Sequence, residues 1–441
     1  MTRPVVLTVV LTCAASTTAA AQSSEATPLA ALVQTIFGPR GLTVHSDARL
    51  PDGSTHSAHF NSAFQSNFRQ FNIALASQLT SVPLPSPASG FTYQFDPSTG
   101  TFARSTQSFG PILADRAETI GRGRILFGYN YQFFSFDALE GVDLRRIPAV
   151  FTHDDFELGG GRTDVVVTTN AIEASVVQFT GLMTYGLHDR VEVSVAVPVV
   201  RTRLAVSSDA LIQRFGTEAG TPVHYFPEET APGGIGDHRH FAAQGTAMGV
   251  GDVVLRTKGT LVREGHRAFA AGVEVRLPSG DEGDLIGSGA WGVRPFAVVS
   301  FAYKRLAPHV NLGYQWNGRS MLAGDPTTGE KQDLPDRITA AVGADVGISD
   351  RLTFAFDLLA NRVLGSPRLV IRPFTVQGPL GAGTFDDITF VDESYFNANG
   401  SAGVKLNVAE GVLVNFNVRF NLSSRGLTDR LVPLVGVEYG F

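Results

Sequence analysis

Apolar and polar residues alternate along this chain with a period of two. From Ile125 to Phe133 every second residue is aromatic or aliphatic, and the other positions include Gly128, Asn130 and Gln132. Successive side chains of a β-strand point to opposite faces, so this pattern predicts strands with one apolar and one polar face. The alternation recurs at residues 191–199, 269–277, 310–316, 352–358 and 412–420.

Alternation also suits a soluble β-sandwich, and the lengths of the connections separate the two folds. Tight links lie at residues 187–190, 263–267, 305–308, 349–351 and 409–411. Long polar links lie between them, at residues 137–161, 207–246, 279–290, 319–333 and 364–393, with a shorter one at 423–429. Short turns at one end and long loops at the other are typical of an outer-membrane barrel with its turns in the periplasm.

These links delimit about 12 strands, each near or above the roughly 9–11 residues that cross the hydrocarbon. An unpaired strand edge in lipid would cost several kcal/mol for each open N–H or C=O, so the sheet must close. The predicted fold is therefore all-β, a closed antiparallel transmembrane β-barrel. The last strand places Val435, Val437, Tyr439 and Phe441 on one face. Such an aromatic C-terminus resembles the signal that the barrel-assembly machinery recognises.

Composition narrows the classes of protein further. A mean hydropathy of +0.08, without an apolar run of about 18 residues, excludes a helical membrane protein. The net charge of −6 argues against nucleic acid as a partner. Arg3, the apolar stretch Val5–Leu11 and the alanines at 19–21 read as a secretory signal covering residues 1–21. Its removal takes away Cys13, the only cysteine, so the mature chain has neither disulfides nor thiolate metal ligands.

Residues 22–115 lack full-length membrane strands and precede a barrel predicted at 116–441. A short helix is predicted at Pro28–Phe37. A small hairpin is predicted from Thr92–Phe95 and Thr101–Ala103, because the intervening DPSTG favours a turn. The segment is interpreted as a plug in the lumen. A periplasmic extension, or an extra strand pair in a 14-stranded wall, is the alternative.

Several stretches resemble a family of outer-membrane transporters named for the MetA pathway of phenol degradation. They are Gly90–Gln132, Thr184–Val200, Gly249–Lys258, Arg276–Asp281 and His309–Tyr314. The resemblance spans roughly residues 85–441 and implies a barrel that moves aromatic or other apolar small molecules, similar in general idea to the long-chain fatty-acid channels. It implies no cofactor and no catalytic residue.

Strand parity predicts which side chains line the lumen. Opposite charges on neighbouring strands are expected to pair there, and apolar side chains would suit an apolar solute. Bracing of a wet interior is the alternative role for the charges. The candidates are Arg256, Lys258, Glu274, Arg276, Asp345, Asp357, Phe134 and Phe296.

Other chemistry in the loops is weighed against this channel. Asp237, His238 and His240 could bind a divalent metal, and acidic runs at residues 281–284 and 386–392 could hold calcium bridging to lipopolysaccharide. A lipid hydrolase would need Ser288 with a histidine base. Hydrated loop tips are the simpler interpretation of the acidic runs, the histidines lack a carboxylate at a matching spacing, and no strand-to-helix elbow surrounds Ser288. The sequence therefore predicts an exported outer-membrane channel for small, apolar or aromatic compounds, with membrane lipid and lipopolysaccharide around it. A structural or surface-binding barrel with a closed lumen is the alternative.

Overall fold

The computed structural model describes residues 27–38, 41–45, 59–60, 62, 70–74, 76, 93–96, 101–104, 107–152, 164–216, 224–230 and 232–441. The signal sequence predicted at residues 1–21 lies outside the described residues. No helix in these ranges is long and apolar enough to cross a membrane.

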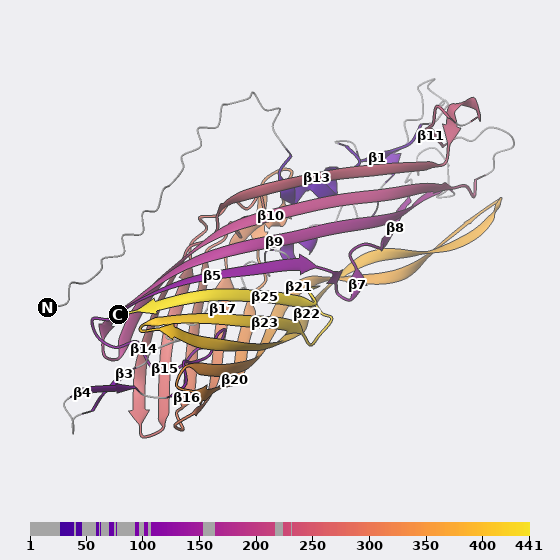
Figure 1. The fold of residues 1–441 in the computed structure, drawn as a ribbon. Coiled ribbons are helices and arrows are strands. Elements are labelled where there is room, and N and C mark those ends of the chain that lie inside the picture. Colours follow the sequence, from indigo (N-terminus) through magenta and orange to yellow (C-terminus); the bar gives the residue numbers. More distant parts are fainter. Residues whose placement is uncertain are drawn as a thin grey trace, which may run out of the picture.

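Twelve antiparallel strands form a closed ring, as the sequence predicts (Figure 1). Closure is made where the last strand pairs with the first, for example at Val437 and Tyr129. In ring order the strands are β5 (Ile125–Phe136), β9 (Val165–His188), β10 (Val191–Gln213), β14 (Val254–Glu264), β15 (Arg267–Arg276), β16 (Gly292–Phe301), β17 (Leu306–Asn317), β20 (Arg337–Ser349), β21 (Leu352–Gly378), β22 (Gly381–Ala409), β23 (Val412–Asn421) and β25 (Leu431–Gly440).

Two further strands enlarge the sheet beyond the ring. β8 (Ile147–Thr152) pairs with β9, and β13 (His238–Val250) pairs with the part of β10 that β14 leaves uncovered. The 14 strands of the sheet therefore belong to a 12-stranded barrel with two additions, and not to a 14-stranded wall.

The tight turns lie where the sequence predicts them, but two of the predicted long loops are wrong. Residues 364–393 form the outer halves of β21 and β22, a ribbon that continues well past the ring. Much of 207–246 is strand as well, since β10 runs to Gln213 and β13 begins at His238. β-branched and aromatic residues, which favour strands, keep β21 and β22 paired out to the end of this ribbon. Figure 1 shows this extension at the end opposite the C-terminus.

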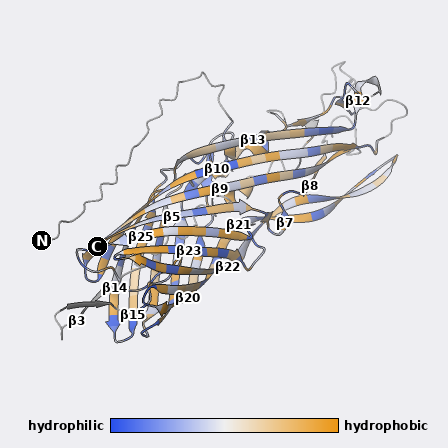
Figure 2. Cartoon of the chain, in the orientation of Figure 1, coloured by the Kyte–Doolittle hydropathy of each residue, from blue (hydrophilic) through white to orange (hydrophobic). Residues whose placement is uncertain are grey.

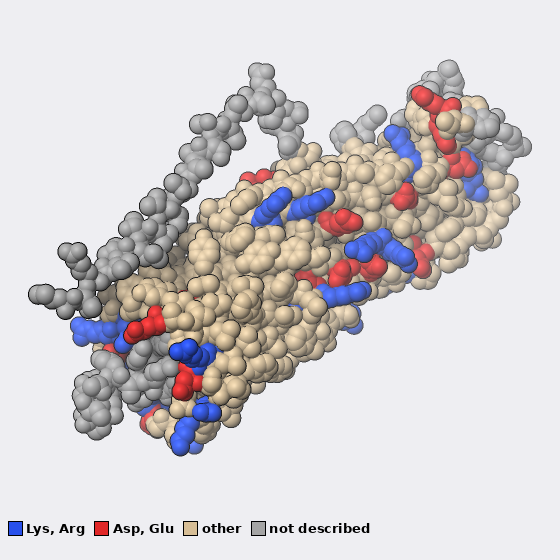
Figure 3. All heavy atoms as spheres, viewed as in Figure 1, with Lys and Arg blue, Asp and Glu red and all other residues tan. Residues whose placement is uncertain are grey.

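The outer face of the ring is apolar. Phe127, Tyr129, Phe356, Phe416 and Val437 are all exposed, and each alternates with a buried neighbour along its strand. The alternation of apolar and polar positions is visible along the strands in Figure 2. On the face shown in Figure 3, charged side chains gather at the turn end and along the extension, and few lie between. This band is the surface that a transmembrane barrel presents to hydrocarbon.

The N-terminal elements are short. The predicted helix is present as a 3-10 turn, η1 (Leu29–Ala31), continued by α1 (Leu32–Thr35). Phe37 follows it and packs edge-on against Phe151 and Phe241, with ring centroids 5.2 and 5.0 Å apart. This helical segment is therefore buried against the extended strands, in the outer part of the molecule. The predicted hairpin is also present, as β3 (Tyr93–Asp96) and β4 (Thr101–Arg104), beyond the turn end of the ring in Figure 1.

The remaining elements are short and lie in the N-terminal segment or in the connections between the strands of the ring. They are β1 (Leu42–Thr43), β2 (His59–Phe60), β6 (Ala138–Leu139), β7 (Val142–Asp143), β11 (Phe226–Pro227), η2 (Pro232–Gly234), β12 (Ile235–Gly236), β18 (Arg319–Asp325), β19 (Glu330–Asp333) and β24 (Leu427–Thr428).

Candidate functional site

Residues 107–124, here called the luminal loop, enter the barrel from the turn end and return to it. At one end the amide of Gln107 donates to the carbonyl of Lys304, in the turn between β16 and β17. At the other end Gly123 donates to Gly186, beside the turn between β9 and β10. Every residue from 108 to 121 is buried. The loop therefore occupies the lumen next to the turns.

Side chains from separate strands of the wall hold the luminal loop. Arg116 forms an ion pair with Asp345 of β20, and Asp115 forms one with Arg256 of β14. The ammonium of Lys258 donates to the carbonyls of Arg116 and Glu118, each at 2.9 Å. Charged hydrogen bonds of this kind are the stronger ones in proteins, and here they are shielded from water. These interactions tie the luminal loop to β14 and β20, which are four strands apart around the ring.

A second group of charges lies beside this anchor. The imidazole of His309 is 2.7 Å from the carboxylate of Asp357 through Nε2 and 3.6 Å from that of Asp345 through Nδ1. All three side chains are fully buried. Asp345 therefore accepts from the luminal loop on one side and faces a histidine of the wall on the other.

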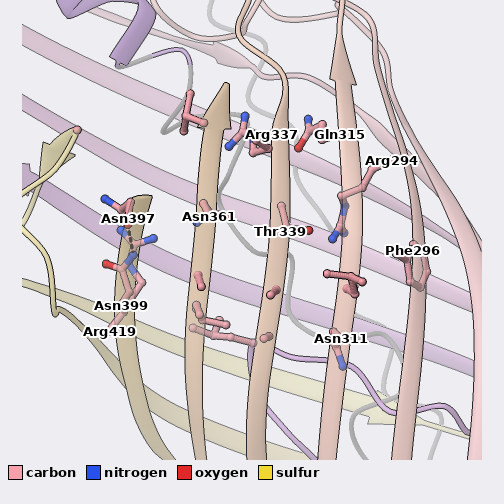
Figure 4. Close-up of a pocket in the computed structure, with 18 of the residues that line it drawn as sticks. Arg294, Phe296, Asn311, Gln315, Arg337, Thr339, Asn361, Asn397, Asn399 and Arg419 are labelled. Atoms are coloured by element: carbon pink, nitrogen blue, oxygen red, sulfur yellow. Dashed lines mark hydrogen bonds between the residues drawn. The ribbon is translucent and has the colours of Figure 1, made fainter. Parts of the chain in front are cut away.

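A cavity of about 130 Å³ lies above the luminal loop. Leu113 and Asp115 of the loop form part of its lining, and Ala74 with Leu427 contributes from the outer segments. The rest is wall, from β15 to β23, and Figure 4 shows its polar side chains converging from neighbouring strands. The cavity thus lies between the luminal loop and the outer part of the molecule.

A row of polar side chains crosses the cavity wall. Glu274 of β15 is the register partner of Arg294 of β16, and the guanidinium donates to both carboxylate oxygens, at 2.6 and 3.4 Å. Gln315 of β17 is the register partner of Arg337 of β20. The amides of Asn361, Asn397 and Asn399 continue the polar lining toward Arg419 (Figure 4). Amides and arginines, both good donors, therefore dominate this surface.

Seven of the eight candidate residues are buried and Glu274 is half-buried, but the charged ones pair differently from the expectation. Arg256 of β14 and Glu274 of β15 are register partners, so the expected pairing of opposite charges on neighbouring strands would join these two side chains. Arg256 instead pairs with Asp115 of the luminal loop, and Glu274 pairs with Arg294. Arg276 donates to Asn317, at 2.8 Å, and lies 3.6 Å from Asp252.

The aromatic candidates lie under cations. The guanidinium of Arg256 is 4.4 Å from the ring centre of Phe296, and that of Arg419 is 5.3 Å from the ring centre of Phe134. Such contacts stabilise a buried cation. The apolar surface of these two rings is therefore partly covered by charge, which the parity argument did not anticipate.

Sequence reasoning missed the most connected residues of the site. Asp115 and Arg116 of the luminal loop, and Arg294, Arg337, Asn361 and Arg419 of the wall, were not among the candidates. The adjacent opposite charges of Asp115 and Arg116 inside the otherwise apolar PILADRA are the one signal that could have found the loop.

Asp429, in the loop between β23 and β25, gives the outer side of the site a dependence on pH. Burial raises the pKa of its carboxyl to about 7, and Asp137 adds to this, while Arg419 opposes it. A carboxyl whose pKa is higher in the folded than in the unfolded chain destabilises the fold as pH rises from about 4 to 7. We expect Asp429→Asn to raise the melting temperature at pH 8 and to change it little at pH 4. Equal effects at both pH values would contradict this.

The metal and hydrolase candidates have other partners. Asp237 pairs with Arg214, while His240 lies 2.7 Å and His238 3.7 Å from Asp209. The described part of the chain contains no group of three or more histidine, cysteine, aspartate or glutamate side chains that could hold a metal ion.

Ser288 is buried, and its hydroxyl donates to Asp252 at 2.5 Å. Glu282 accepts from Ser320 and Met321 and pairs with Lys331, which ties the loop at 279–290 to β18 and β19. These contacts give Ser288 and Glu282 a structural role in that loop.

Comparison with known proteins gives weak structural similarity only. No protein-family model matches the chain, and no curated protein matches it by sequence. The COG4313 outer membrane channel from Pseudomonas putida F1 is 14% identical, with a TM-score of 0.45 over 74% of this chain and 98% of that one.

Two other solved structures are less similar. A FadL homologue from Pseudomonas aeruginosa is 10% identical, with a TM-score of 0.30 over 80% of this chain and 94% of that one. The toluene transporter TbuX from Ralstonia pickettii is 11% identical, with a TM-score of 0.28 over 73% and 90%. Values this low assign neither a ligand nor a family. The resemblance to the phenol-degradation transporters is not confirmed, and the fold, a closed transmembrane β-barrel of 12 strands, is known from the structure of the chain itself.

Proposed function

We propose that the protein is an outer-membrane channel through which small apolar or aromatic compounds pass without an energy source. The observation that supports this is the cavity inside the wall, between the luminal loop and the outer segments. A barrel of eight strands is filled by its own side chains, whereas larger barrels enclose cavities or channels. With 12 strands, this ring has room for a passage that the luminal loop narrows.

Residues 22–115 and the luminal loop act in this proposal as a plug. Its supporting observations are the buried contacts of residues 108–121 with the wall and the burial of α1 in the outer part of the molecule. The channel is closed when these contacts are made and conducts when the loop moves aside.

The surroundings of the protein follow from the same proposal. The apolar outer band would contact membrane lipid, and the longer extension would stand among the lipopolysaccharide outside the cell. The terminal strand β25, with Val437, Tyr439 and Phe441 exposed on one face, would present the signal for barrel assembly.

Passage through vesicles that carry lipopolysaccharide tests the channel. We expect phenol, and benzoate at pH 7.4, to leave vesicles faster when the protein is present, while sucrose stays inside because a disaccharide is larger and more polar than a single aromatic ring. Vesicles without protein give the background for each solute. If no solute shows protein-dependent passage, and release of the luminal loop by mutation changes nothing, the structural barrel with a closed lumen is the better interpretation.

A further inference from the structure

The apolar outward face of β10 ends in two arginines. Every second residue from Val191 to Val199 is an outward-facing valine, and the next two outward residues are Arg201 and Arg203. Arg201 is ten residues along the strand from Val191. At about 3.3 Å per residue and a tilt of about 40°, this places it roughly 25 Å higher along the barrel axis, the usual height of the apolar band. The two arginines therefore lie where the hydrocarbon ends, at the start of the extension, and Figure 3 shows cationic side chains over this part of the sheet.

Both arginines are available to bind a ligand. They are exposed, and no carboxylate in the described part of the chain forms an ion pair with either of them. Glu173 of β9 is a diagonal neighbour of Arg203 and is itself exposed, but the two side chains do not pair. The register partners of the two arginines on the flanking strands are all uncharged: Val177 and Met248 for Arg201, Ser175 and Thr246 for Arg203. Two cations side by side on one face repel each other, so an anion between them is favoured.

A lipid phosphate suits this position. The planar guanidinium group of arginine can donate two parallel hydrogen bonds to a phosphate. Directly below the arginines, Val199 is the register partner of Phe179 on β9 and of Val250 on β13. These apolar side chains provide a surface for the acyl chains of the same lipid. The site therefore matches a molecule that carries both a phosphate and hydrocarbon chains.

The surface beyond the arginines distinguishes a glycolipid from a phospholipid. The outward residues there are mostly small or polar, and include Ser175, Ser207, Gln244 and Thr246. A phospholipid reaches little beyond its phosphate, whereas a phosphorylated sugar continues outward along the sheet. Hydroxyl and amide side chains both donate and accept hydrogen bonds, as sugar hydroxyls require. The position favours a phosphorylated glycolipid of the outer leaflet.

We infer that Arg201 and Arg203 bind a phosphate of the lipid anchor of lipopolysaccharide, with its acyl chains on the valines of β10 and its sugar along the extension. The inference uses the proposed orientation of the barrel, with its turns in the periplasm. It does not depend on whether the lumen conducts. It adds one specific lipid site to the general contact of the apolar band with the membrane.

Native mass spectrometry of the detergent-solubilised full chain, titrated with lipid, tests the inference. The probes are phosphorylated lipid A, lipid A without its phosphates, and phosphatidylglycerol, which has a phosphate but no sugar. We expect phosphorylated lipid A to bind at least tenfold more tightly than either of the others. Arg201→Gln combined with Arg203→Gln should weaken phosphorylated lipid A tenfold or more and change phosphate-free lipid A less than twofold. Inorganic phosphate at the same concentration should not displace lipid A, because it lacks the chains.

Arg190→Gln combined with Arg351→Gln is the matched control. It removes the same two positive charges from exposed arginines in tight turns at the other end of the ring, and should bind all three lipids as the native protein does. The heat-dependent shift in gel migration shows that each variant is folded. Equal binding of lipid A with and without phosphates, or native binding by the variant of Arg201 and Arg203, would overturn the inference. Phosphatidylglycerol binding as tightly as lipid A would also overturn it, in favour of a site for any anionic lipid.

Passage of phenol through vesicles reports separately on the channel. The variant of Arg201 and Arg203 should pass phenol as the native protein does, because both residues lie on the outer face. Absence of phenol passage with intact lipid A binding would count against the channel alone, so the two proposals fail independently.

Discussion

Replacing Arg116 with alanine is expected to increase passage of single-ring solutes through the barrel at least tenfold. The side chains of Arg116 and Asp345 are 2% and 0% exposed, and their ion pair joins the luminal loop to the wall. Removing one partner of a buried pair costs about 3–5 kcal/mol, because the other charge is left uncompensated. Each 1.4 kcal/mol is a factor of ten in a population, so the released state of the loop should become about a hundredfold or more commoner. Single-channel conductance in planar bilayers measures the effect directly.

Two variants control for this result. Arg122→Ala removes an exposed arginine from the same loop and should leave conductance unchanged. Arg116→Ala combined with Asp345→Asn removes both charges, so conductance should fall back part of the way toward the native value. An Arg116→Ala protein that keeps its heat-dependent gel shift and conducts like the native protein would show that the luminal loop does not close the passage.

The strands of the barrel wall could be predicted from the sequence because the features that define them, alternating side chains and short turns, involve residues close together in the chain. Alternation with a period of two fixes which face each side chain takes, and a turn needs only a few residues of recognisable type. Hence the 12 strands, the tight turns and the inward position of residues such as Lys258 and Asp357 follow from the sequence.

What fills the lumen could not be predicted in this way. Parity says that Arg256 points inward, but it does not say that a distant segment brings Asp115 to meet it. The pair is 141 residues apart in the chain, and no repeating pattern links the two positions. For the same reason, the sequence did not reveal that Arg294, Gln315 and Arg337 line one cavity. These residues come together only because their three strands lie side by side.

The prediction of where the outer strands end was wrong for a different reason. The loop prediction assumed that strands end where the membrane does, but hydrogen bonding between strands continues wherever side chains suit a pleated sheet. Val370, Ile371 and Thr375 of β21 meet Thr389, Ile388 and Thr384 of β22, all residues that favour strands. The polar residues between them are compatible with a ribbon in water.

An arginine in the apolar band should destabilise the barrel strongly, and its cost depends on depth. Val437 lies near the middle of β25 on the outer face, where it is 44% exposed. We expect Val437→Arg to lower the free energy of unfolding in lipid vesicles by about 2–4 kcal/mol, the range for a cation near the bilayer midplane. Denaturant titration followed by tryptophan fluorescence measures the change.

The same substitution outside the band separates lipid from other causes. Gln244 also faces outward, but it lies on β13 above the apolar band and is exposed. Gln244→Arg should cost about 0–1 kcal/mol, the value near or beyond the interface. Val437→Ala controls for the loss of the native side chain and should cost less than the arginine. If the two arginine variants lose equal stability, Val437 does not face hydrocarbon, and the apolar band would have to be explained by contact with protein instead.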